Sequence, residues 1–173
     1  MKNFWIAIFL LSIISCTPEK AHNSDVNVVN ASAFSFFKVT SGSTISLSST
    51  EGNIILAFGN PSIITPGVSE FNEYPNTKWI YKGATIYLQA GRMVNIDLKS
   101  SAFGFFFNGS EIRVGQDIDK LKTIFPISFS SKSTSQMMVG LNYNGEPVDS
   151  RILFSFNKQN LITSISLVNV ASL

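Results

Sequence analysis

The feature that most constrains this chain is an internal echo, in which one stretch is followed by a second built on the same plan. Residues 33–61 and 102–126 both open Ala-Phe-x-Phe-Phe, 69 positions apart (102 − 33), and both close on a Pro. Each then places Gly-Ser before two alternating apolar residues, at an offset of 67 (109 − 42). Later matches are Trp79-x-Tyr81 with Leu141-x-Tyr143, and Ile96 and Leu98 with Ile165 and Leu167. The pattern predicts two copies of one structural unit, residues 33–101 and 102–173.

The first unit carries the signals of strands, one short helix and then more strands. Segments 34–39 and 44–48 alternate in polarity around a turn at Ser41-Gly42-Ser43, which predicts a hairpin. A helix follows, with capping candidates at 48–51, and it ends at Gly59 and Pro61. Its apolar face is predicted from Ile54, Ile55 and Phe58. Residues 62–76 form a predicted loop, and strands 77–81, 85–90 and 93–99 a predicted antiparallel meander.

The second unit repeats this plan. Segments 103–107 and 111–114 predict a hairpin across Asn108-Gly109, a pair typical of a two-residue type I′ turn. Asp117 caps a predicted helix over 118–125 that Pro126 ends, and a Ser-rich loop covers 128–136. Strands are predicted at 138–143, 151–157 and 161–170. The fold class is therefore α+β: two tandem repeats, each a β-hairpin, a short helix and a three-stranded antiparallel meander, packed as one domain.

The N-terminus predicts export. Lys2 precedes an apolar run over residues 4–14, which is shorter than the roughly 20 residues of a membrane-spanning helix. A basic start and a short apolar core are typical of a secretory signal peptide, here residues 1–15. Its end, Ile13-Ile14-Ser15-Cys16, resembles the lipobox of bacterial lipoproteins. That resemblance implies a diacylglycerol anchor on Cys16, and the alternative is an ordinary signal peptide with an incidental Cys.

The residues after Cys16 suggest where the anchor holds the protein. Residues 16–32 are mostly polar without sustained periodicity and are predicted to be a flexible tether. Thr17 does not resemble the Asp that retains some lipoproteins at the inner membrane, which favours the outer membrane. Because Cys16 is the sole Cys, no disulfide is expected within the chain.

Composition argues for a sheet-rich protein and against nucleic-acid binding. Charged residues make up 14% of the chain, against roughly 25% in typical soluble domains, and Phe is abundant at fifteen. Without Lys2, the chain has 12 basic (13 − 1) and 11 acidic side chains and shows no long basic run. A nucleic-acid partner is therefore not expected.

The chain offers few groups for catalysis. The only His, His22, falls in the predicted tether. A Ser-His-Asp triad therefore lacks its general base, and a zinc site lacks its Cys and His ligands. Glu70 and Glu73 are the remaining candidates for a glycosidase-type carboxylate pair, and two solvated loop charges are the simpler interpretation. We expect no enzymatic activity, no cofactor and no metal.

A family resemblance rests on the helix and on the strands that follow it. The matching residues are Ile54, Ile55, Phe58, Gly59, Pro61, Trp79 and Tyr81, then Gly115, Ile118, Leu121, Phe125 and Pro126. A capped helix, Phe-Gly-x-Pro, a loop and Trp-x-Tyr resemble the SmpA/OmlA outer-membrane lipoproteins and the related β-lactamase-inhibitor-like fold. The resemblance implies a non-enzymatic protein that binds another envelope protein and reaches the membrane through Cys16.

The candidate binding surface follows from this resemblance and from the aromatic residues near residues 62–76. It consists of Phe71, Tyr74, Trp79 and Tyr81, although packing of Trp79 and Tyr81 under the helix is the simpler interpretation. Loops 62–76 and 127–137 are expected to form matching edges of a concave surface. The alternative function is binding of a carbohydrate or small ligand through Tyr74, Trp79 and neighbouring Asn side chains.

Overall fold

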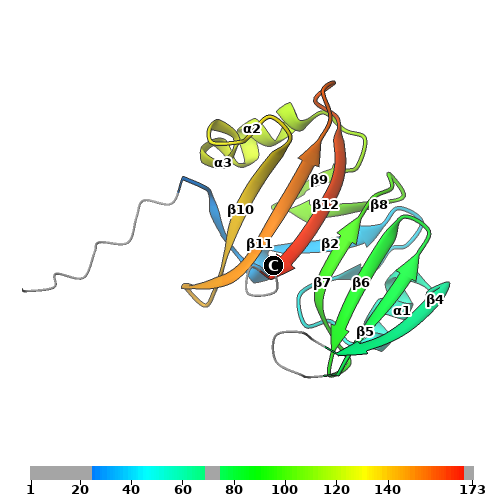
Figure 1. Cartoon of the computed structure of the whole chain (residues 1–173). Helices are drawn as coiled ribbons and strands as arrows, with labels where there is room; N and C mark the ends of the chain where they lie inside the picture. The colour runs from blue at the N-terminus through cyan, green and yellow to red at the C-terminus, as the bar shows by residue number, and fades with distance from the viewer. Residues whose placement is uncertain (1–24, 69–74, 170–173) are drawn as a thin grey trace, which may run out of the picture.

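The protein is known from a computed structural model, which describes residues 25–68 and 75–169. Its larger sheet, sheet A, has eight strands in the order β1-β10-β11-β12-β7-β6-β5-β4 (Figure 1). The strands are β1 (Val28–Asn30), β4 (Ile63–Val68), β5 (Pro75–Tyr81), β6 (Ala84–Gln89), β7 (Arg92–Leu98), β10 (Gln136–Tyr143), β11 (Glu146–Phe156) and β12 (Ile162–Asn169). Neighbouring strands are antiparallel, except that β1 pairs parallel with β10.

A second layer lies behind sheet A in the view of Figure 1. It contains the four-stranded sheet B, in the order β3-β2-β8-β9, and the helices. The elements are η1 (Ala31–Ala33), β2 (Phe34–Lys38), β3 (Thr44–Ile45), α1 (Glu51–Phe58), β8 (Phe103–Phe107), β9 (Ser110–Arg113), η2 (Ile118–Lys120), α2 (Leu121–Ile124) and α3 (Pro126–Ser130). Sheets and helices together make an α+β fold.

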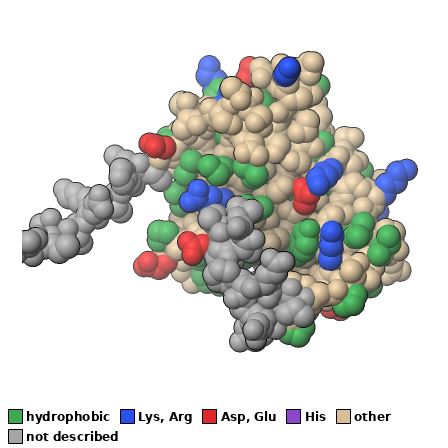
Figure 2. Space-filling model, in the orientation of Figure 1, with side chains coloured by type: hydrophobic (Ala, Val, Ile, Leu, Met, Phe, Trp, Pro, Cys, Tyr) green, Lys and Arg blue, Asp and Glu red, His purple; other side chains and the backbone are tan. Residues whose placement is uncertain are grey.

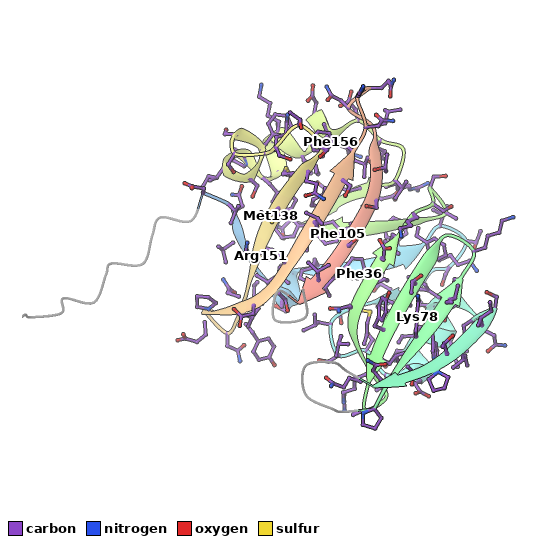
Figure 3. All side chains as sticks on the ribbon, viewed as in Figure 1. Phe36, Lys78, Phe105, Met138, Arg151 and Phe156 are labelled. Atoms are coloured by element: carbon purple, nitrogen blue, oxygen red, sulfur yellow. The ribbon has the colours of Figure 1, made fainter. Side chains whose placement is uncertain are left out.

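Phenylalanine side chains join the two layers. Phe36 and Phe105 are fully buried, and their ring centroids lie 5.7 Å apart (Figure 3). Phe105 meets Phe154 of sheet A edge-on at 5.9 Å, and Phe154 in turn lies 6.2 Å from Phe125, the residue after α2. Aromatic pairs at such distances add about 0.5–1.5 kcal/mol beyond the area that they bury. The Phe-rich composition thus forms the core between the layers.

Two strand pairs connect residues 33–101 with the rest of the chain. In sheet B, β2 pairs with β8, and the middle pair is Phe36 with Phe105. In sheet A, β7 pairs with β12, and the middle pair is Asp97 with Ser166. The two residues of each middle pair are 69 positions apart (105 − 36 and 166 − 97).

Several strand predictions are confirmed closely. β8 spans the predicted 103–107, and Asn108 and Gly109 have φ angles of 46° and 78°, as a type I′ turn requires. The predicted strand 151–157 is longer than expected, because β11 begins at Glu146 and forms a long hairpin with β10.

The first helix is confirmed, but one of its predicted core residues is wrong. α1 begins after Thr50, which forms a capping box with Asn53. Ile54 and Phe58, four residues apart, are buried, whereas Ile55 is 41% exposed. Each helical residue is rotated about 100° from the last, so a two-turn helix on a flat layer buries the i, i+4 pair and turns Ile55 outward.

Pro126 starts a helix here, contrary to the prediction that it ends one. It is the first residue of α3, a position where the missing N–H costs nothing because the first helical N–H groups have no partner within the helix. The predicted Ser-rich loop over 128–136 is therefore wrong at its start, since α3 continues to Ser130, and β10 begins at Gln136.

Both edges of sheet A were missed. Residues 28–30, predicted to lie in a flexible tether, form β1, and η1 follows at once. Residues 63–68, predicted to lie in a loop, form β4, with Pro66 inside the strand. An edge strand tolerates Pro because one side of its backbone has no ladder to complete.

Candidate functional site: the open face of sheet A

Sheet A buries one face and leaves the other open, because successive side chains of a strand point in opposite directions. In β6, Ala84, Ile86 and Leu88 are at most 4% exposed, and the residues between them are half-buried. Sheet B and the helices cover the buried face, while no described helix or strand lies in front of the other one (Figure 1). We call this second surface, seen in Figure 2, the open face.

A row of directly opposed residues crosses the open face over seven strands. In order from β4 to β10, the row is Ile63, Ile80, Thr85, Asp97, Ser166, Leu153 and Met138. Its two ends are apolar and its middle is polar. The only ionisable side chain in the row is that of Asp97.

The middle of the row joins two strands that are distant in the sequence. Ser166 Oγ on β12 donates a hydrogen bond of 2.8 Å to Asp97 Oδ1 on β7. Lys99 Nζ lies 2.7 Å from Asp97 Oδ2, and its side chain is 67% exposed. The hydrogen bond with Asp97, followed by the attraction between the charges, raises the pKa of Lys99. The Asp97 carboxylate is therefore held on both sides, by Ser166 and by Lys99.

Two long cationic side chains lie along the open face instead of extending from it. Lys78 Nζ is 5.8 Å from the centroid of the Tyr87 ring, and Arg151 Nη1 is 3.9 Å from Met138 Sδ (Figure 3). A cation over an aromatic ring at this distance is worth about 0.5–1 kcal/mol at an exposed site. These contacts place positive charge on both flanks of the central carboxylate.

The open face can bind by hydrogen bonds and apolar contact. Within residues 25–68 and 75–169, no group of three or more His, Cys, Asp or Glu side chains is placed to hold a metal ion. Asn95 Oδ1, beside the central row on β7, is buried without a hydrogen-bond partner.

Two residues of the predicted binding surface lie in the core. Trp79 and Tyr81 are only 4% and 8% exposed, because they point to the inner face of β5, under α1. Tyr81 Oη donates a 3.1 Å hydrogen bond to the Gly59 carbonyl, and its ring meets Phe58 edge-on at 5.9 Å. Burial raises the pKa of Tyr81 to about 12. The packing interpretation is correct for both residues, and Trp79 is not available to stack on a sugar.

The other predicted site residues lie outside the described part of the chain. These residues are Cys16, His22, Glu70, Phe71, Glu73 and Tyr74.

The open-face residues were missed by the sequence reasoning, although a signal was present. Ser164 and Ser166 in β12 and Thr85, Tyr87 and Gln89 in β6 alternate with buried apolar residues. Such alternation identifies a sheet with one covered and one uncovered face. The aromatic residues Trp79 and Tyr81, predicted as binding residues, are instead part of the core.

A smaller surface lies on the outer side of sheet B. Phe37 is 7% exposed and Phe106 is 38% exposed, and their rings meet edge-on at 5.9 Å. The Arg113 guanidinium lies 5.8 Å from the centroid of Phe37 and pairs with Glu111. Phe106 is thus the ring of the Phe105–Phe107 run that points away from the core.

None of the described helices is long and apolar enough to cross a membrane. No protein-family model and no curated protein sequence matches the chain. A similar solved structure is the 1.5 Å crystal structure of an extracellular protein containing an SCP domain from Bacillus anthracis str. Ames. The TM-score is 0.43 at 10% sequence identity, and the match covers 72% of this chain and 44% of that one. The present chain thus corresponds to less than half the length of that protein.

Proposed function

We propose that this chain is a non-enzymatic lipoprotein of the bacterial envelope, held at the outer membrane through Cys16, that binds another envelope protein with the open face of sheet A. The observation that carries the proposal is the uncovered row of seven opposed side chains, apolar at both ends and polar in the middle.

The size of the open face suits a protein partner. Six inter-strand spacings of about 4.8 Å make the row about 29 Å long. Strands of six to eleven residues, at about 3.3 Å per residue, extend it by at least about 20 Å in the other direction. The product, roughly 600 Å², approaches the 800 Å² or so that each partner contributes to a standard interface. A surface this broad is more suitable for a folded partner than for one small ligand.

The predicted anchor supports the choice of an envelope partner. A lipobox-like sequence ends at Cys16, nine residues before the first described residue, Asp25. A protein tethered this closely to a bilayer meets its partners in the envelope, either in the membrane or next to it.

We further propose that residues 33–101 and 102–173 are two copies of one unit related by an approximate two-fold axis. Where a strand of one copy pairs with the equivalent strand of the other, a two-fold axis between them exchanges the two strands. The two residues of the central pair must then be equivalent positions of the two copies. The pairs Phe36–Phe105 and Asp97–Ser166 both join residues 69 positions apart, which is the offset of the repeated Ala-Phe-x-Phe-Phe.

Two isolated bridges support the same relation. Thr50 bridges to Arg92 in the first unit, and Asp117 bridges to Leu161 in the second. Thr50 and Asp117 are 67 positions apart (117 − 50), and Arg92 and Leu161 are 69 positions apart (161 − 92). The same two offsets relate the repeated sequence motifs.

The register also corrects one equivalence that the sequence suggested. Trp79 is opposite Ile86, and the counterpart of Ile86 in the second unit is Phe154. The residue opposite Phe154 is Met137, so Met137, not Leu141, is the counterpart of Trp79. The β10–β11 hairpin is longer than β5–β6, so matching the turns misaligns the strands before them. The repeat therefore places Asp97 and Ser166, at the centre of the open face, at equivalent positions of the two units.

The proposal is tested by inserting charge into the open face. Leu153→Lys and Thr85→Lys change equivalent positions of the two units, and Leu56→Lys changes a 73% exposed residue of α1 as the matched control. After in-cell cross-linking and mass spectrometry, we expect a partner captured by the parent protein to be lost from both open-face variants and retained by the control. The Cys16→Ala variant, which lacks the proposed anchor, should also fail to capture the partner. Retention of the partner by both open-face variants would contradict this site.

A further inference from the structure

The segment that leads into the domain is fixed to α3. Asn27 and Ser128 exchange two hydrogen bonds: Asn27 N–H donates to Ser128 Oγ at 2.8 Å, and Ser128 N–H donates to Asn27 Oδ1 at 3.0 Å. Ser128 is only 1% exposed, the sole polar residue in the buried class among the described residues. Gly140 N–H donates to the Asn27 carbonyl at 2.8 Å, and Ser131 Oγ donates to the Asp25 carbonyl. The chain therefore enters the domain against α3.

The distance from the predicted anchor to this entry point is bounded by chain length. Cys16 and Asp25 are nine residues apart (25 − 16). Even a fully extended chain spans at most about 3.3–3.6 Å per residue, so the entry point lies within roughly 30 Å of an anchor on Cys16. A domain of this size is itself about 38 Å across, from a radius of gyration of about 15 Å. The α3 end is thus held near the bilayer, while the α1–β4 end lies across the domain from it (Figure 1).

The α3 end carries the side chains that suit an anionic lipid surface. Ile127 on α3 is 52% exposed, and the stretch from Lys120 to Gln136 has three lysines and no acidic residue. Asp25 is also exposed at this end, and exposed Asp117 and Asp119 precede the stretch, so Lys122 and Lys132 are the cations nearest to α3 in the sequence.

Two further features lie at this end of the domain. Lys132 Nζ lies 5.1 Å from the centroid of Phe129 and 5.4 Å from that of Phe156. A hollow of about 470 Å³, lined by Asp25, Pro126, Ile127, Ser130 and Ser131, lies next to the entry point.

We infer that the α3 end is a membrane-docking surface: Ile127 inserts at the headgroup level of an anionic phospholipid layer, and Lys122 and Lys132 contact its phosphates. Each lysine near an anionic surface contributes a modest attraction that ionic strength weakens. The chain length that holds this end close to the bilayer raises the local concentration of lipid, so a weak contact suffices. The inference rests on the proposed anchor at Cys16.

The test supplies the anchor chemically, so that its result does not depend on lipidation in the cell. The chain from Cys16 onward has one Cys and one Trp, Trp79, which is 4% exposed. Cys16 is coupled to maleimide-lipid vesicles that contain brominated phosphatidylcholine and phosphatidylglycerol. Ile127→Trp reports on the α3 end, and Ile64→Trp, at a residue 55% exposed on β4, is the matched control.

We expect bromine quenching of Ile127→Trp at least about twofold stronger than that of Ile64→Trp, and weaker when phosphatidylglycerol is left out. Raising the salt from about 0.1 M to about 1 M, which shortens the Debye length from about 10 to about 3 Å, should also weaken it. Adding Lys122→Gln and Lys132→Gln to Ile127→Trp should reduce the quenching, whereas Lys82→Gln, in the β5–β6 turn, should not.

Equal quenching of the two Trp variants, or none, would overturn the docking inference. Mass spectrometry of the protein from cells decides the anchor separately: a Cys16 without a diacylglycerol would refute the proposed lipoprotein and leave the vesicle result standing.

Discussion

In the proposed repeat, Phe37 and Phe106 occupy equivalent positions on the outer side of sheet B, yet they differ in burial. They are 69 residues apart (106 − 37) and lie on the two strands, β2 and β8, that join the proposed units. Phe37 is 7% exposed and Phe106 is 38% exposed. In the core of the same sheet, the equivalent residues Phe36 and Phe105 are both fully buried.

The residue across the strand explains the difference. Phe37 is opposite Gly104, and a Cβ built on that glycine would lie 2.4 Å from Phe37 Cζ, so the ring occupies the space that a side chain would fill. Phe106 is opposite Ser35, which carries a side chain where Gly104 has none. Arg113, opposite Gly104, also covers the Phe37 ring.

If the proposed repeat is correct, this comparison separates what the two units share from what differs between them. The proposed units share the rings of Phe36 and Phe105, which contact each other across β2 and β8, so a change in one ring would disturb the other. Side chains on the outer faces are free of that constraint and differ. We therefore expect binding specificity to be found on outer faces, and stability in the shared pairs.

The largest effect is expected at the shared ring pair. Phe36→Ala and Phe105→Ala should each lower the free energy of unfolding by about 3–5 kcal/mol, because each removes a fully buried ring. Chemical denaturation measures both, and equivalence of the units requires values within about 1 kcal/mol of each other. If only one of the two variants is destabilised, the core is not symmetric in energy.

Gly104→Ser makes the second unit resemble the first at this position. The new Cβ would clash with the Phe37 ring and lie 2.8 Å from the Ile112 carbonyl oxygen. We therefore expect the free energy of unfolding to fall by about 1–3 kcal/mol. The reverse exchange, Ser35→Gly, should cost at most about 1 kcal/mol, the backbone penalty of glycine in a strand. Thermal unfolding of both variants checks this order, and similar losses would show that the ring does not depend on Gly104.

A pH dependence should come from the first unit alone. In the proposed repeat, the counterpart of Tyr81 is Val139, which is opposite Ile152 and has no ionisable group. Since burial raises the Tyr81 pKa from 10.0 to about 12, the unfolded chain loses this proton before the folded one does. The contribution is fully present below pH 10 and is lost between pH 10 and 12, on the order of 1 kcal/mol. Denaturation across that range should show a steeper fall for the parent than for Tyr81→Phe; parallel curves would contradict the assignment.

The smallest effect is expected at the cation over Phe37. Arg113→Gln keeps hydrogen-bonding capacity but removes the charge above the ring, at a cost of about 0.5–1 kcal/mol. The matched change Glu111→Gln removes the ion-pair partner and leaves the stacking. Urea midpoints distinguish the two, and a larger loss for Glu111→Gln would show that the ion pair matters more than the ring contact.

Local signals predicted the elements that depend on local physics. Alternation and turn residues were sufficient for the β8–β9 hairpin, and the capping residues for α1. β1 was missed because its three residues form a strand only by pairing with β10, which lies more than 100 positions later in the sequence. β4 was missed because Pro66-Gly67 is typical of a turn. A strand can contain Pro66 only because β4 lies at the edge of sheet A, where one side of its backbone has no neighbouring strand.

The candidate site was harder to predict than the fold. Trp79 and Tyr81 were chosen as exposed aromatics, but the sequence cannot show which face of β5 the helix covers. Asp97 and Ser166 meet only because β7 and β12 pair, and no local pattern near either residue predicts that contact.

Photo-cross-linking from single positions tests the central claim, that the open face binds an envelope protein, most directly. A benzophenone amino acid replaces Thr85, Leu153 or, as the control, Leu56 in the lipid-anchored protein in intact cells. We predict one adduct of the same mass from Thr85 and Leu153 and none from Leu56, because the first two flank the Asp97–Ser166 centre of the open face and Leu56 lies on α1. An adduct from Leu56 alone would place the partner elsewhere and contradict the proposed site.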